Sequence, residues 1–101
     1  MSSLPYSVLN LFESPRGYLA EIARIPRPGP ESEWVWIERR RATTLQPVDS
    51  GEGLTFEEGT LRLDGRQGEL RWSDGRSEAL TRRDPQALPP PLRGLLELHL
   101  T

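Results

Sequence analysis

The sequence predicts a single small α+β domain, mainly β, in which a twisted antiparallel sheet or small open barrel of about five to seven strands is joined by one short C-terminal helix. Apolar and polar residues alternate over several short segments, which places one face of each segment on a core. Dipeptides typical of tight turns, Asp64-Gly65, Gln67-Gly68 and Asp74-Gly75, separate these segments. The length of 101 residues suits one domain over residues 1–101 and leaves little room for two.

The first part of the chain predicts a β-hairpin. Tyr6–Glu13 is apolar and partly β-branched, and Ser14–Gly17 follows with proline and glycine where a type I turn favours them. Tyr18–Ile25 then continues as the second strand. A short helix would also fit its apolar spacing, but the turn is short and the segment stops at Pro26, so strand is the favoured interpretation.

A proline-rich segment, residues 26–33, predicts a surface loop, because three prolines fix φ and remove backbone donors. Trp34 to Leu45 then predicts one long strand, opened by aromatic and β-branched residues and closed by threonines. Both faces of this segment are apolar at its start and charged in its middle. We therefore expect one end to be covered on both sides and the other end to emerge into solvent.

After a second loop, Gln46 to Gly53, residues 54–81 predict an antiparallel β-meander of three or four strands. Leu61 and Leu63 share one face of a strand, and Leu70 and Trp72 share one face of the next. The turns between the strands are rich in Gly and Asp, which tolerate positive φ.

The C-terminal part predicts two short helical pieces. Asp84-Pro85 combines an N-cap residue with a proline in the first turn, and the run Pro89–Pro91 limits that piece to about one turn. Residues 92–100 follow as a C-terminal helix, since Leu92, Leu95, Leu96 and His99 fall on one helical stripe.

Composition argues against most catalytic and metal sites. There is no cysteine, so thiolate ligands and cysteine nucleophiles are excluded, and the single histidine, His99, makes a histidine metal site or a Ser-His-Asp triad a poor interpretation. We expect no enzyme activity, no cofactor and no metal. A net charge of −2 also argues against a general nucleic-acid coat.

The sequence contains no apolar run long enough to span a bilayer, and its N-terminal residues lack the positive charge and cleavage site of a secretory signal. The expectation is a cytoplasmic protein with no membrane partner.

The most distinctive cluster is formed by Trp34, Trp36, Arg39, Arg40 and Arg41, which we identify as the candidate partner-binding residues. Tryptophan and arginine are the commonest hot-spot residues of protein interfaces. The same residue types would also stack on bases and pair with phosphates in a nucleic-acid-binding module. A third interpretation is that the tryptophans belong to the core and the arginines to a solvated edge.

Two segments carry a resemblance to a known family. The SDGR turn followed by QALPPPLRGLLELHL resembles the end of emfourin-like metalloprotease inhibitors, and VLNLFESPRGYLAEI is similar to their first hairpin. These segments cover about a third of the chain. The central helix of that family is replaced here by the β-rich WVWIERRRATTL. The resemblance implies a small α+β fold and a protease-inhibitor role.

Taken together, the residues favour a non-enzymatic interaction module, an adaptor, regulator or inhibitor that binds a partner protein. An exposed sheet edge would in addition allow two copies to pair as a homodimer.

Overall fold

The computed structural model describes residues 6–24, 32–48 and 54–100. These residues form eight strands, one 3₁₀ helix and one α-helix, more strands than the five to seven predicted. In chain order the elements are β1 (Tyr6–Glu13), β2 (Tyr18–Arg24), β3 (Glu33–Glu38), β4 (Arg41–Thr44), β5 (Leu54–Thr55), β6 (Gly59–Asp64), β7 (Gln67–Trp72), β8 (Ser77–Arg83), η1 (Pro85–Ala87) and α1 (Pro90–Leu100).

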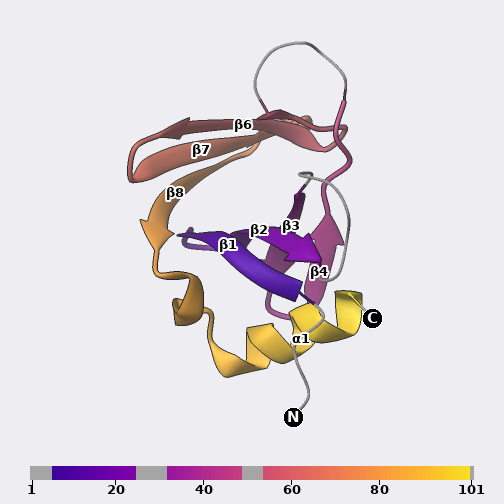
Figure 1. Ribbon diagram of the computed structural model, residues 1–101. Coiled ribbons are helices and arrows are strands. Elements are labelled where there is room, and N and C mark those ends of the chain that lie inside the picture. Colours follow the sequence, from indigo (N-terminus) through magenta and orange to yellow (C-terminus); the bar gives the residue numbers. More distant parts are fainter. Residues whose placement is uncertain (1–5, 25–31, 49–53, 101) are drawn as a thin grey trace.

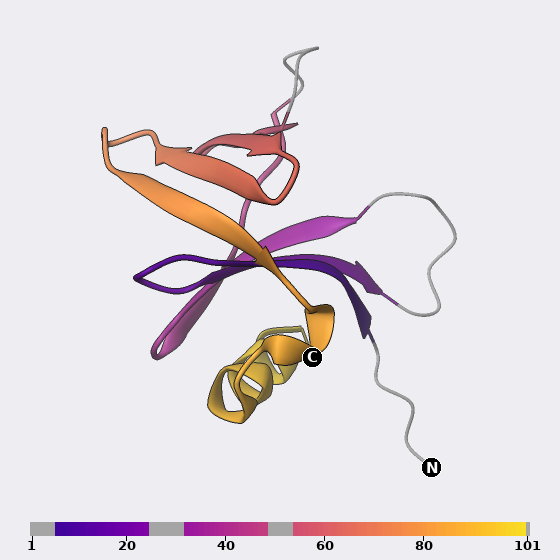
Figure 2. The same cartoon turned by 90° about the vertical axis from the view of Figure 1, so that its left-hand side faces the viewer.

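The eight strands form one antiparallel sheet in the order β4-β3-β2-β1-β8-β7-β6-β5. Two four-stranded meanders meet where β1 pairs with β8, and the sheet curls into a half-barrel in which β6 and β7 lie over β1–β4 (Figures 1 and 2). The two ends of the sheet come together again at an isolated bridge between Pro47 and Phe56. The predicted antiparallel sheet and short C-terminal helix are confirmed.

The long strand predicted for Trp34 to Leu45 is wrong. Glu38 pairs with Arg41, so the segment is a hairpin of β3 and β4 with Arg39 and Arg40 in the turn. Tyr18–Arg24 is a strand, as favoured over a helix. Most of the proline-rich segment 26–33 lies outside the described residues, and its last residue, Glu33, begins β3.

Strands β1–β3 are buried on both faces. Their inner face packs into a cluster inside the half-barrel, formed by Phe12, Leu19, Trp34, Trp36, Leu45, Phe56, Leu61, Leu70 and Leu80. Their outer face packs against α1, which lies on the opposite side of β1–β4 from β6 and β7 (Figure 1). This outer cluster contains Tyr6, Leu11, Ala20, Ile22, Val35, Ile37, Leu88, Leu96 and Leu100.

Helix α1 begins at Pro90, two residues before the predicted start. Pro90 and Pro91 stand in its first turn, where the missing N–H groups would have no intrahelical partner. The helix contributes the buried Leu96 and Leu100 to the outer cluster, and His99 Nε2 forms a 2.7 Å hydrogen bond with Thr44 Oγ1 of β4. No helix in the described part of the chain is long and apolar enough to cross a membrane.

Candidate functional site

Strand β3 places its side chains alternately in the two clusters. Trp34 and Trp36 point into the half-barrel, whereas Val35 and Ile37 point outward beneath α1. Period-2 alternation produces this division, and apolar residues at successive positions fit a strand covered on both sides.

The two candidate tryptophans are therefore core residues, with only 7% of Trp34 and 3% of Trp36 exposed. Trp34 stacks on Phe12 at 6.3 Å between ring centroids, and Trp36 meets Trp72 edge-to-face at 5.5 Å. Trp36 Nε1 donates a 2.8 Å hydrogen bond to Glu38. Little of either ring is exposed at the surface, although Trp36 contributes to the wall of a pocket described below.

The arginines of the cluster are surface residues. Arg39 and Arg40 form the exposed turn between β3 and β4, and the exposed Arg41 begins β4. No described residue other than glycine has positive φ, so this turn is not of the type I′ common in two-residue hairpins. Among the described residues, Arg39, Arg40 and Arg41 have no ion-pair partner.

A second turn brings Arg16 beside these arginines. Ser14 Oγ accepts hydrogen bonds from the backbone N–H groups of Arg16 and Gly17, at 3.1 and 3.2 Å, which fixes the turn between β1 and β2. Gly17 lies so close to β3 that a Cβ atom there would be 2.3 Å from the carbonyl oxygen of Ile37. This close approach lets the two turns lie side by side.

Arg16 links the turn to two carboxylates. Its guanidinium lies 4.0 Å from Glu38 and 3.4 Å from Glu78. Glu78 is only 3% exposed, and Ser14 Oγ donates a 3.3 Å hydrogen bond to it. A buried carboxylate requires such partners. Sequence reasoning missed Glu78, because it pairs opposite Leu70 and faces inward only in this strand register.

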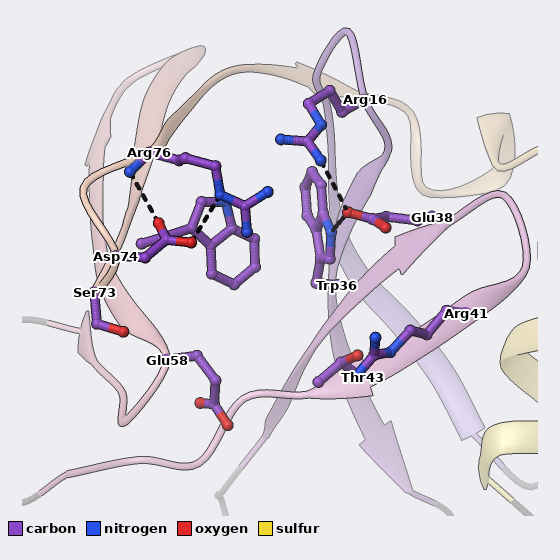
Figure 3. Close-up of a pocket in the computed structure, with 10 residues that line it drawn as sticks. Arg16, Trp36, Glu38, Arg41, Thr43, Glu58, Ser73, Asp74 and Arg76 are labelled. Atoms are coloured by element: carbon purple, nitrogen blue, oxygen red, sulfur yellow. Dashed lines mark hydrogen bonds and ion pairs between the residues drawn. The ribbon is translucent and has the colours of Figure 1, made fainter.

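A pocket of about 420 Å³ opens between these residues and the turn that joins β7 to β8 (Figure 3). Arg16, Trp36 and Glu38 stand on one side, and Asp74 and Arg76 stand opposite them (Figure 3). Asp74 accepts hydrogen bonds from the backbone N–H and the side chain of Arg76, at 3.0 and 2.8 Å. The backbone hydrogen bond is the main cause that holds the pKa of Asp74 below its ordinary value.

A more basic hollow, of about 580 Å³, adjoins this pocket at the two turns. It is lined by Pro15, Arg16, Glu38, Arg39, Arg40 and Arg41. We call its four arginines, Arg16, Arg39, Arg40 and Arg41, the arginine rim. Glu38 is the one carboxylate in this lining, so the hollow presents an excess of positive charge.

The described residues contain no cluster of His, Cys, Asp or Glu that could hold a metal ion. The guanidinium groups of the arginine rim can pair with negative charges and donate hydrogen bonds.

We compared the chain with protein families, curated proteins and solved structures. No protein-family model, no curated protein and no solved structure matches the chain. The resemblance of the tail and first hairpin to emfourin-like inhibitors accordingly stays a prediction.

Proposed function

We propose that this chain is a non-enzymatic interaction module that binds an acidic segment of a partner protein at the arginine rim. The observation that supports this most directly is the hollow of about 580 Å³, whose lining holds four arginines and one carboxylate, Glu38. Arg16 is also paired with the buried Glu78, whereas Arg39, Arg40 and Arg41 have no ion-pair partner among the described residues. Arginine pairs with carboxylates through two parallel hydrogen bonds, which gives geometric specificity as well as attraction.

The support beneath the rim favours recognition by a preformed surface. The turn that carries Arg16 is fixed by Ser14 and pressed against β3 at Gly17, and β3 itself is anchored in both clusters by Trp36 and Ile37. Because this surface is already ordered, less conformational entropy is lost when a partner binds. Complementary charge would also accelerate the encounter.

Nucleic acid is the competing ligand, since phosphates pair with the same guanidinium groups. Single-strand binders add stacking of bases on exposed aromatic rings. Trp34 and Trp36 expose only 7% and 3% of their surface, so they offer little area for base stacking, and we favour an acidic polypeptide as the ligand.

The test compares two double charge reversals of equal size. Arg39→Glu/Arg40→Glu changes the rim, and Arg66→Glu/Arg71→Glu changes two exposed arginines elsewhere. Each protein is titrated with a fluorescent poly-glutamate peptide and with a single-stranded oligonucleotide of equal charge, at several salt concentrations.

We expect the wild type and the control variant to bind the peptide more tightly than the oligonucleotide, and the rim variant to lose peptide binding while its circular dichroism stays native. Equal binding by both variants would overturn the proposal. If the oligonucleotide binds more tightly than the peptide and its affinity falls steeply with salt, the ligand of this site is nucleic acid.

A further inference from the structure

The pocket of about 420 Å³ between the two meanders contains one unpaired charge of each sign. Its described lining balances three guanidinium groups with three carboxylates, which belong to Arg16, Arg41, Arg76, Glu38, Glu58 and Asp74. Arg16 lies 4.0 Å from Glu38, and Arg76 lies 2.8 Å from Asp74. In the part of the chain that the structure describes, neither Arg41 nor Glu58 has an ion-pair partner.

Glu58 is held at one wall of the pocket by its backbone and by one carboxylate oxygen. Phe56 and Gly59 exchange backbone hydrogen bonds of 2.8 and 3.2 Å, so Glu58 lies in the tight turn before β6. Its carbonyl oxygen accepts a 2.8 Å hydrogen bond from the N–H of Ser73, and its side-chain Oε1 accepts one of 2.9 Å from the N–H of Gln46. The other carboxylate oxygen has no hydrogen-bond partner among the described residues, so it remains available to a ligand.

Strand β4 forms the opposite wall. Arg41 and Thr43 are two residues apart on this strand, so their side chains share one face, and both line the pocket. Figure 3 shows them across the pocket from Glu58. The Thr43 hydroxyl makes no hydrogen bond with another described residue. A guanidinium group and a free hydroxyl together offer the donors that a carboxylate ligand accepts.

Two indole rings supply the apolar part of the pocket. Trp36 and Trp72 meet edge-to-face at 5.5 Å, and both belong to the lining. Trp36 is almost wholly buried, so the half-buried Trp72 offers most of the accessible ring surface. The volume falls in the range of small-ligand pockets, about 300–1,000 Å³. The pocket thus combines an apolar wall with separate positive and negative groups.

We propose that this pocket binds a small amino-acid zwitterion with an apolar side chain, either a free amino acid or a dipeptide. The ammonium group of the ligand pairs with Glu58, and its carboxylate pairs with Arg41 and the Thr43 hydroxyl. The apolar side chain packs against Trp72. A purely anionic ligand meets the like charge of Glu58, and a purely cationic ligand meets that of Arg41, so the lining favours a ligand that carries both signs.

The ligand test removes one charge at a time. L-phenylalanine and L-alanyl-L-phenylalanine carry both charges, phenethylamine carries only the ammonium group, and phenylpropionate carries only the carboxylate. Each is titrated into isotope-labelled protein while NMR follows the indole N–H signal of Trp72, which the variant Trp72→Phe assigns. We expect at least one zwitterion to bind about tenfold more tightly than either analogue, because each analogue leaves Arg41 or Glu58 without a partner.

Two variants of one turn locate the site. Glu58→Gln keeps the shape of the side chain and an acceptor for the Gln46 N–H but removes the charge, whereas Glu57→Gln changes the exposed neighbour outside the described lining. Glu58→Gln should weaken binding of the zwitterion about tenfold and strengthen binding of phenylpropionate, which no longer meets a like charge. Glu57→Gln should change neither affinity. Equal weakening of both ligands in Glu58→Gln would show a merely structural role and contradict the proposal.

The rim variant Arg39→Glu/Arg40→Glu separates this inference from the proposed function, which it goes beyond. Arg39 and Arg40 are not among the described residues that line the pocket, so this variant should lose poly-glutamate binding and keep zwitterion binding. Glu58→Gln should show the reverse pattern. The proposal is overturned if no zwitterion shifts the Trp72 signal at its solubility limit, or if either single-charge analogue binds as tightly as the zwitterions.

Discussion

Glu13 shows how one side chain joins neighbouring strands. It accepts a 2.7 Å hydrogen bond from Arg83 Nε of β8 and a 3.1 Å hydrogen bond from the hydroxyl of Tyr18 on β2. The hydrogen bond from Arg83 is the main reason that the pKa of Glu13 lies below its ordinary value. Both partners are partly exposed, so solvent screening limits the contribution of this ion pair to stability to at most about 1 kcal/mol.

The first prediction concerns this carboxylate. A depressed pKa in the folded state stabilises the fold above the unfolded value of about 4.3, and this stability disappears as the pH falls through the lower folded pKa. Arg83→Met should move the pKa of Glu13 back towards its ordinary value, as measured by NMR titration of the side-chain carboxyl. Arg71→Met, which removes the partner of Glu69, is the matched control and should leave Glu13 unchanged. An unaltered titration of Glu13 in Arg83→Met would contradict the assignment.

Residue identity alone predicted only part of the candidate site. The exposure of Arg39, Arg40 and Arg41 was expected, because three guanidinium groups cannot be buried without partners. The positions of Trp34 and Trp36 were not decided by sequence, since a strand that is apolar on both faces fits a core as well as an interface. Glu78 could not be found at all, because its burial depends on the register of β8 against β7.

At the scale of elements, two glycines differ in how much space surrounds them. Gly17 sits where the turn between β1 and β2 presses on the backbone of Ile37. Gly94 lies in the exposed middle of α1, and a Cβ atom added there would meet nothing within 4 Å. The same substitution should therefore have opposite effects at the two sites.

We expect Gly17→Ala to lower the free energy of unfolding by about 1–3 kcal/mol, because the new methyl group forces β2 and β3 apart. Gly94→Ala should raise it by about 0.5–1 kcal/mol through helix propensity and reduced chain entropy. Urea denaturation of both variants measures the difference. A neutral Gly17→Ala would show that the two turns are not in close contact.

Turn chemistry explains which elements could be predicted. Asp64-Gly65 and Asp74-Gly75 were recognised as turns, and Gly65 and Gly75 adopt positive φ, at 64° and 98°. The turn predicted at Gln67-Gly68 is wrong, because these two residues begin β7. The turn at Arg39-Arg40 has neither glycine nor asparagine and no positive φ, so no local signal divides β3 from β4. Helix α1 was predicted from its leucine stripe, but its start was placed late because prolines were taken as a stop rather than as a first turn.

At the scale of the whole molecule, the two clusters share β1, β2 and β3 as a common wall. Loss of side chains from either cluster weakens the same strands. Removing the side chain of Leu96 in the outer cluster or of Phe12 in the inner cluster should cost about 2–5 kcal/mol in each case.

This shared wall predicts one cooperative unfolding transition. Tryptophan fluorescence reports on the inner cluster, and far-ultraviolet circular dichroism at 222 nm reports on α1. The two signals should give the same urea midpoint in the wild type and in Leu96→Ala. A helix signal that is lost at lower urea than the fluorescence would show that α1 detaches before the half-barrel opens.

The central place of β1 has a consequence for how the protein is made. One neighbour, β2, follows β1 after a short turn, but the other, β8, comes from the far part of the chain, where Glu13 pairs with Thr81. At about 5–20 residues per second, a ribosome exposes β1 for several seconds before β8 emerges. During that time the first meander presents an unpaired strand in the nascent chain. The sheet can therefore close only after translation has passed β8.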